Sequence, residues 1–235
     1  MSILFSDIYE KAIALFDDPK ITVAYQTNII QFDKLMYTYL QNAITMFHNP
    51  ASIALKLASY NEPSGVMQVW VSDGANSTLK LDDAFEIKEN SEYLFVEGEL
   101  TVEGVLDKDS RTVTFPDVLP KGKEYAFEQY YVGEFLDTFT NFNKKVPGSD
   151  AMVQNTIKDI LARLLVRAWG EGERNLLLDI RNILQDSDFK LTPNNRILDS
   201  KNEWIDQLDS EIFQLQNRLA WMIRFTGSST NIGRG

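Results

Sequence analysis

The hydrophobic pattern of this chain changes its period twice. Apolar residues recur every three or four positions up to about residue 64 and again after about residue 136, which is typical of amphipathic helices. Between these limits, short β-branched and aromatic runs alternate with polar positions and are separated by turn residues. The pattern therefore predicts an α+β protein, in which residues 1–64 and 136–225 form a helical bundle scaffold and residues 65–135 form an inserted antiparallel β-sandwich or barrel module.

The last third of the chain is expected to contain three helices. The first should end near Trp169, because Gly170-Glu171-Gly172 is expected to break it before a second helix begins. The third should begin at a capping box, in which Ser200 and Glu203 each satisfy a free amide of the other. Its apolar stripe, at spacings of three and four, consists of Trp204, Leu208, Ile212, Leu215, Leu219 and Met222.

The middle module is expected to contain about five strands at intervals of about ten residues, as in small sandwiches and barrels. The candidate strands are Val66–Val71, Tyr93–Val96, Leu100–Val105, Thr112–Phe115 and Glu124–Val132. Two polar segments between them, Asp73–Asn76 and Asp107–Ser110, contain oxygen ligands suited to calcium. Neither has the spacing of an EF-hand loop, with its glycine and closing glutamate in the required positions, so plain turns are predicted.

The residue inventory excludes several kinds of chemistry. The chain has no cysteine, which excludes disulfides, thiol nucleophiles and thiolate-bound zinc or iron–sulfur centres. His48 is the only histidine, and it precedes Asn49-Pro50 at an expected helix end, where a cation is favoured by the helix dipole. No pair of carboxylates falls in a segment that indicates a cleft. We therefore expect no catalytic, cofactor-binding or metal-binding residue, no cofactor and no enzymatic activity.

The charge of the chain is negative and unevenly distributed. The formal net charge is -11, and residues 65–149 hold 8 basic and 16 acidic side chains. Tight, sequence-independent binding of nucleic acid is therefore not expected. No stretch has the length and apolarity of a membrane span or the organisation of a signal peptide, so we expect no membrane contact and a cytoplasm-like compartment.

Two features near the C-terminus suggest contacts with other chains. Trp221 lies off the apolar stripe, and it is an interface candidate together with Trp204 and Arg224. The stripe itself is expected to be buried either within the subunit or between subunits. Residues 226–235 show no periodicity and are predicted to form a flexible arm that adds to the sheet edge of a partner. The arm residues expected to dock are Thr226, Asn231, Ile232 and Arg234; the alternative is an ordinary frayed terminus.

Several segments of the chain resemble the neck, or head–tail connector (adaptor), proteins of tailed bacteriophages. These segments are Phe5–Ala12 with Phe16–Pro19, Lys34–Ala43, Lys158–Glu171 and the helix expected from Ser200. The resemblance implies a non-enzymatic virion structural protein that forms a homo-oligomeric, twelve-fold ring below the portal protein. It also implies contacts with adjacent neck or tail proteins, a channel through which DNA passes without specific binding, and assembly in the host cytoplasm into the neck of the virion.

The β module departs from the connector pattern, because it is larger than the insertions of minimal connectors. The layer of the neck or tail that the chain occupies therefore stays open. Two alternatives also stay open: a carbohydrate- or protein-binding tail module, and a glycan hydrolase with acidic residues on the β module.

Overall fold

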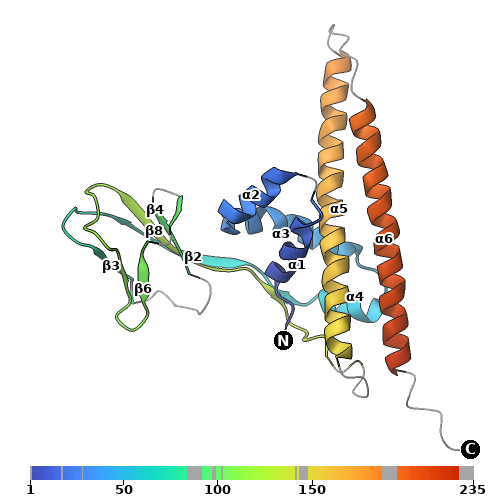
Figure 1. Cartoon of the computed structure of the whole chain (residues 1–235), viewed down its shortest axis with the longest axis horizontal. Helices are drawn as coiled ribbons and strands as arrows, with labels where there is room; N and C mark the ends of the chain where they lie inside the picture. The colour runs from blue at the N-terminus through green and yellow to red at the C-terminus, as the bar shows by residue number, and fades with distance from the viewer. Residues whose placement is uncertain are drawn as a thin grey trace, which may run out of the picture. The chain divides into compact units, whose positions relative to one another are not determined.

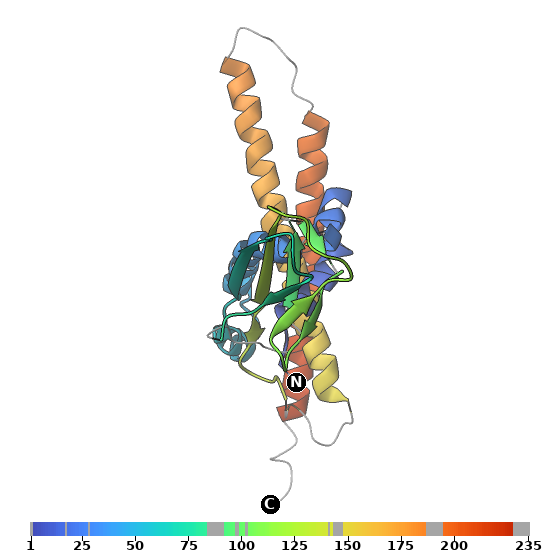
Figure 2. The same ribbon diagram turned by 90° about the vertical axis from the view of Figure 1, so that its left-hand side faces the viewer.

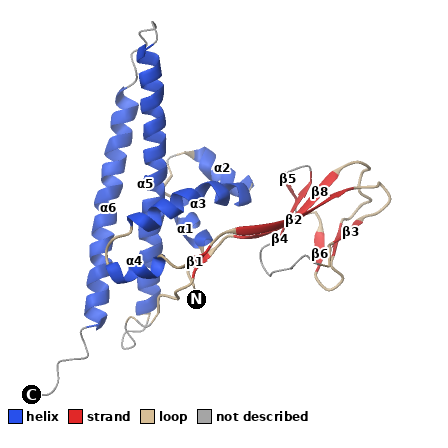
Figure 3. Cartoon of the chain, turned by 180° about the vertical axis from the view of Figure 1, so that it is seen from behind, coloured by secondary structure: helices blue, strands red, loops and turns tan. Residues whose placement is uncertain are grey.

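The computed structural model describes residues 2–16, 18–27, 29–83, 92–96, 99–101, 103–140, 142, 148–186 and 195–227. These residues contain six helices and nine strands, and the α+β class predicted from the sequence is confirmed (Figures 1 and 3). The chain forms two compact units. Unit 1 comprises Met1–Pro19, Leu35–Asn61 and Glu134–Gly235, and unit 2 comprises Lys20–Lys34 and Glu62–Gly133.

Unit 1 is built on two long helices, α5 (Ser149–Asp186) and α6 (Asn195–Gly227), which lie side by side and antiparallel (Figures 1 and 2). α1 (Phe5–Ile13) packs against α5, and α4 (Ala51–Leu57) and the later part of α3 (Ile29–Met46) complete the unit. The helices bury apolar residues at spacings of three and four, as the periodicity predicts. Buried members include Phe5, Ile8, Met36, Leu40, Ile157, Ile160, Leu161, Leu164, Ile205, Leu208, Ile212 and Leu219.

A short two-stranded sheet belongs to the same unit. β1 (Tyr60–Asn61) pairs antiparallel with β9 (Glu134–Phe135), and Leu4 forms an isolated bridge to Glu134. The ring of Phe135 meets the ring of Phe5 edge to face, with the centroids 5.2 Å apart. The sheet thus anchors the start of α1 in the aromatic core of the unit.

Unit 2 contains two antiparallel sheets. The larger has the strand order β2 (Ser64–Val71), β8 (Glu124–Tyr131), β4 (Glu92–Val96) and β5 (Glu99–Thr101). The smaller has the order β3 (Thr78–Lys80), β7 (Thr112–Thr114) and β6 (Val105–Asp107). Both sheets contribute to one core, which is the arrangement of a small sandwich. Its buried residues are Leu79, Leu81, Val113, Phe115, Leu119, Tyr125 and Phe127.

Helical residues 20–34, most of α2 (Pro19–Thr27) and the start of α3, belong to unit 2, although the sequence pattern places them in the helical scaffold. Ile30 is buried against Tyr130 of β8. The Tyr130 hydroxyl donates a hydrogen bond to Oδ2 of Asp33, a fully buried carboxylate. Lys34 extends the contact, with its ammonium 3.4 Å from Oε1 of Glu128. Apolar burial and a polar anchor together attach this helical segment to the sheet.

Two predicted helix boundaries in the last third are wrong. α5 continues from Ser149 to Asp186 without a break at Gly170-Glu171-Gly172. α6 begins at Asn195, so Ser200 and Glu203 lie inside the helix and do not form a capping box at its start. At 33 residues, α6 is about 50 Å long at 1.5 Å per residue.

Other predicted elements also need correction. The run Leu100–Val105 does not form one strand: β5 and β6 occupy it in different sheets, with a bend at 103–104 between them. The described residues of unit 2 contain seven strands, β2 to β8, rather than about five. α2 was not predicted at all. The predicted arm starts too early, because Thr226 and Gly227 belong to α6.

Candidate interaction surfaces

Trp204, predicted as an interface residue, lies in a contact inside unit 1. Its ring meets that of Trp169 edge to face, with centroids 6.4 Å apart. The ammonium of Lys201 lies 4.5 Å from the centroid of Trp169 and 5.0 Å from that of Trp204. Phe16 packs on the Trp169 ring, with centroids 5.1 Å apart. This aromatic cluster joins α5 to α6 and gives Trp204 a role in holding the helix pair together.

Ion pairs along the same helix pair fix α6 on α5. The guanidinium of Arg167 donates to both carboxylate oxygens of Asp209 and lies 3.0 Å from Oε1 of Glu171. Burial opposes the charge of Arg167, but its hydrogen bonds and charge interactions with these two carboxylates outweigh burial and raise its pKa. The bidentate geometry makes this contact directional as well as attractive.

A second pair repeats the arrangement. Nε of Arg163 donates to Oε2 of Glu211 at 2.8 Å, and the Gln207 amide donates to Oε1 of the same carboxylate at 3.1 Å. The hydrogen bonds from Arg163 and Gln207 hold the pKa of Glu211 below its ordinary value of 4.5. α6 is therefore fixed against α5 by charge as well as by its apolar stripe.

The outer face of α6 carries two large aromatic side chains. Phe213 is 67% exposed and Trp221 is 63% exposed, whereas Ile212 and Leu219 on the same helix are buried. Trp221 lies where the sequence analysis expects an interface residue, and Arg224 is exposed one turn later. Phe213 is not among the predicted interface residues, although its position in the sequence carries the same signal as that of Trp221: an aromatic residue directly beside a member of the apolar stripe.

The other predicted docking residues belong to the C-terminal segment. Thr226 lies in the last turn of α6. Asn231, Ile232 and Arg234 lie outside the described residues. Their predicted role in docking stays a prediction.

Unit 2 presents a second apolar surface, on strand β2. β2 stands at one end of the four-stranded sheet. Four of its apolar side chains are between 45% and 67% exposed: Val66, Met67, Val69 and Val71. Gln68 and Trp70 point to the inner side, where both side chains hydrogen-bond the carbonyl of Lys80 at the end of β3. The sequence predicts the strand, but strand order alone shows that it is an edge.

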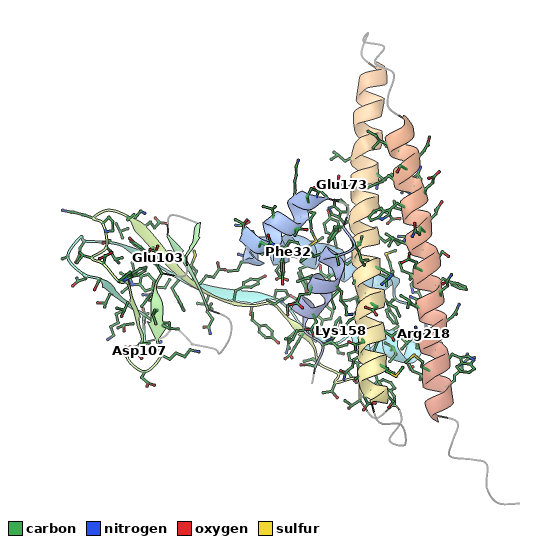
Figure 4. The ribbon with its side chains drawn as sticks, in the orientation of Figure 1. Phe32, Glu103, Asp107, Lys158, Glu173 and Arg218 are labelled. Atoms are coloured by element: carbon green, nitrogen blue, oxygen red, sulfur yellow. The ribbon has the colours of Figure 1, made fainter. Side chains whose placement is uncertain are left out.

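The two acidic loops are turns, as predicted. Oδ1 of Asp107 accepts hydrogen bonds from the backbone N–H groups of Asp109 and Ser110, at the tip of the β6–β7 connection (Figure 4). Oδ1 of Asp73 accepts the N–H of Ala75 at 2.8 Å. Hydrogen bonds from Ser110 lower the pKa of Asp107, and the bond from Ala75 lowers that of Asp73.

The described residues also bear on metal ligation and membrane insertion. Within those ranges, no three or more His, Cys, Asp and Glu side chains gather as metal ligands would. His48 is exposed and follows the end of α3 by two residues. Of the helices described, none combines the length and the apolarity that a membrane crossing requires.

Two surfaces of the described residues suit contact with another chain: the outer face of α6 and the edge strand β2. Comparison with protein-family models, with curated proteins and with solved structures finds no match to this chain.

Proposed function

We propose that the chain is a non-enzymatic structural subunit of the neck of a tailed bacteriophage, where copies of it form a ring that connects the portal and head to the tail. The observation that supports assembly is the outer face of α6, with Phe213 67% and Trp221 63% exposed. Aromatic side chains are enriched at protein–protein interfaces and contribute strongly to them. The assignment to a phage neck rests on the resemblance of the sequence.

The contacts that hold α6 on α5 suit a role of its outer face as an interface. Its inner face is held on α5 by buried apolar residues, by the Trp169–Trp204 contact and by the ion pairs of Arg163 and Arg167. A helix fixed in this way presents Phe213 and Trp221 about 12 Å apart along its axis, at 1.5 Å per residue. Preorganisation of this kind lowers the entropy cost of association.

The acidic charge of the chain suits a subunit past which DNA moves. A net charge of -11 disfavours adhesion of a duplex, and exposed carboxylates such as Glu103 belong to the β module (Figure 4). The same charge on the outer surface of a ring would keep the assembly soluble. Either placement is compatible with DNA passing nearby without being bound.

The mass of the protein in solution tests the assembly proposal. Wild type and the double variant Phe213→Ala/Trp221→Ala are compared by light scattering across a concentration series. The double variant is expected to require at least tenfold more protein to assemble, with an unchanged circular dichroism spectrum. Leu55→Ala is the matched control, because Leu55 is 76% exposed but lies on α4. Equal loss of assembly in the control would remove the role given to α6.

The neck assignment needs a separate measurement. Mass spectrometry and cryo-electron microscopy of virions that contain this chain are expected to find it in a ring between portal and tail. A protein that stays monomeric and cleaves glycans would instead support the hydrolase alternative. Glycan binding without assembly would support the binding-module alternative.

A further inference from the structure

The larger sheet of unit 2 ends in a strand that lacks the usual protection of sheet edges. β2 pairs with β8 over its full eight residues, and the described residues provide no strand on its other side. Its sequence, Ser-Gly-Val-Met-Gln-Val-Trp-Val, contains no charge and no proline. Natural edge strands are commonly short, charged or interrupted by proline, which prevents pairing with other chains. β2 has none of these features and is suited to accept a further strand.

The hydrogen-bonding groups at the open edge follow from the ladder. The N–H of Ser72 donates to the carbonyl of Lys123 at 2.9 Å, and the N–H of Gly122 donates to the carbonyl of Ser72 at 2.8 Å. The backbone N–H and carbonyl of Ser72 both point toward the chain segment that leads into β8, where Gly122 and Lys123 together lie opposite Ser72 as a bulge. Because such positions alternate in antiparallel pairs, the backbone groups of Met67, Val69 and Val71 face away from β8. The side chains of these same residues are exposed.

Charge restricts which strand can pair there. Exposed Glu62 precedes β2, exposed Asp73 follows it, and Oε1 of Glu128 lies close to Gly65, 3.0 Å from where a Cβ would be. Two β2 strands paired with each other would bring these acidic ends together in either orientation. Like charges across strands destabilise pairing. The edge therefore favours a segment without acidic side chains over a second β2.

Residues 228–235 of this chain have that composition. They follow α6 and read Ser-Ser-Thr-Asn-Ile-Gly-Arg-Gly, with Arg234 as the only charged side chain. Eight residues in an extended conformation span about 26 Å, the same length as β2. In a strand, the β-branched Thr230 and Ile232 would share one face with Arg234.

We propose that residues 228–235 of one copy add as an antiparallel strand to β2 of a second copy. We take the antiparallel direction, because it places the Arg234 side chain near Glu62 at one end of β2 and away from Lys121 and Lys123 near the other end. In the register that pairs the full length of both segments, Ile232 lies opposite Met67. This inference rests on the proposed function, because it requires copies of the chain in contact, and it names the segment and the edge that join them.

Disulfide trapping tests the pairing directly, because the chain has no cysteine of its own. Met67→Cys and Ile232→Cys are placed on separate chains, purified, mixed and oxidised under mild conditions. The expected product is a mixed covalent dimer of two 26.9 kDa chains, with the 67–232 disulfide identified by mass spectrometry. Val118→Cys replaces Met67→Cys as the matched control, since the two side chains are 57% and 58% exposed. The control is expected to yield at least tenfold less mixed dimer.

A second variant blocks the edge without removing a buried contact. Val69→Lys, added to the Met67→Cys chain, places a charge at the open edge and is expected to lower the mixed-dimer yield at least fivefold. Val105→Lys is its control, because Val105 is 68% exposed on β6. Circular dichroism establishes that each variant is folded.

Any other outcome would contradict the pairing of residues 228–235 with β2 of a second copy. Dominant Met67→Cys homodimers would show that β2 pairs with itself. A further variant carries both Met67→Cys and Ile232→Cys on one chain, and a disulfide that forms only within that chain would show that the segment does not reach a second copy. If wild type forms a ring but no 67–232 bond appears, this inference fails and the proposed function stands. If the protein never associates and is missing from virions, the proposed function fails with it.

Discussion

The indole ring of Trp204 lies directly against the backbone of Gly170. A Cβ added at residue 170 would fall 2.5 Å from Cζ3 of Trp204, which is closer than real Cβ contacts come. Glycine inside a helix costs about 1 kcal/mol relative to alanine. In α5 this cost is offset by the close approach of Trp204, whose ring also contacts Trp169.

Alanine substitutions at the two glycines of α5 should therefore have opposite effects. Gly170→Ala is expected to destabilise the protein by about 1–3 kcal/mol, because the Trp204 ring must shift. Gly172→Ala is the matched control in the same helix: its Cβ would lie 3.5 Å from the Tyr39 hydroxyl, an ordinary contact. It is expected to stabilise by up to about 1 kcal/mol. Urea unfolding followed by tryptophan fluorescence measures both, and equal effects would contradict the explanation.

The Arg163–Glu211 pair predicts how stability depends on pH. Because the pKa of Glu211 is lowered in the folded state, the unfolded chain binds more protons between the folded value and the ordinary value of 4.5. The stabilisation is complete above pH 4.5 and is lost as the pH falls through the folded value. Glu211→Gln should thus destabilise at pH 7 and have a diminishing effect below pH 4.5.

Thermal unfolding of wild type and Glu211→Gln from pH 7 down to pH 3 measures this difference. Glu203→Gln is the control, because it removes the same charge from an exposed position of the same helix. Its effect on the unfolding temperature should vary less with pH. If the effect of Glu211→Gln stays constant through the acid range, the ion pair does not contribute as described.

The Asp33–Tyr130 hydrogen bond predicts that residues 20–34 unfold together with the sheet. Tyr130→Phe removes a donor from a fully buried carboxylate and should destabilise unit 2 by about 1–3 kcal/mol. Tyr125→Phe is the control, since it removes a hydroxyl from the opposite face of the same strand. Hydrogen exchange by mass spectrometry should show faster exchange in both α2 and β8 for Tyr130→Phe. Faster exchange in β8 alone would show that the helical segment is not coupled to the sheet.

The fold class can be predicted from the sequence, because the α+β prediction depends only on the hydrophobic period, which is a local property. The helix boundaries predicted near residues 170 and 200 depend on more than the hydrophobic period. Gly170 indicates a break until the Trp204 ring that requires a glycine there is known. The start of α6 had its own signal in Pro193-Asn194-Asn195, since proline and asparagine are typical near helix N-termini. The capping pattern of Ser200 and Glu203, five residues after Asn195, indicates a second possible start, which the helix does not use.

Of the two candidate surfaces, one could be predicted from the sequence and the other could not. Exposure of Trp221 could be predicted, because it follows from helical period and a position beside the apolar stripe. The edge position of β2 could not, because it depends on pairing with β8, which is more than fifty residues away in the sequence. Likewise, no local pattern assigns residues 20–34 to the β module. That assignment depends on the contacts of Ile30 and Asp33 with Tyr130.

The end of α6 at Gly227 gives a final prediction about truncation. Deleting residues 228–235 should leave the unfolding temperature within about 1 °C of wild type, because it removes no residue of α6. Deleting residues 226–235 shortens the helix and should lower the temperature slightly more. Both truncations should abolish the association of copies through β2, whereas a Ser/Gly replacement of residues 228–235 at constant length separates sequence from length. Full assembly and infectivity of the shorter truncation would remove any docking role for the segment.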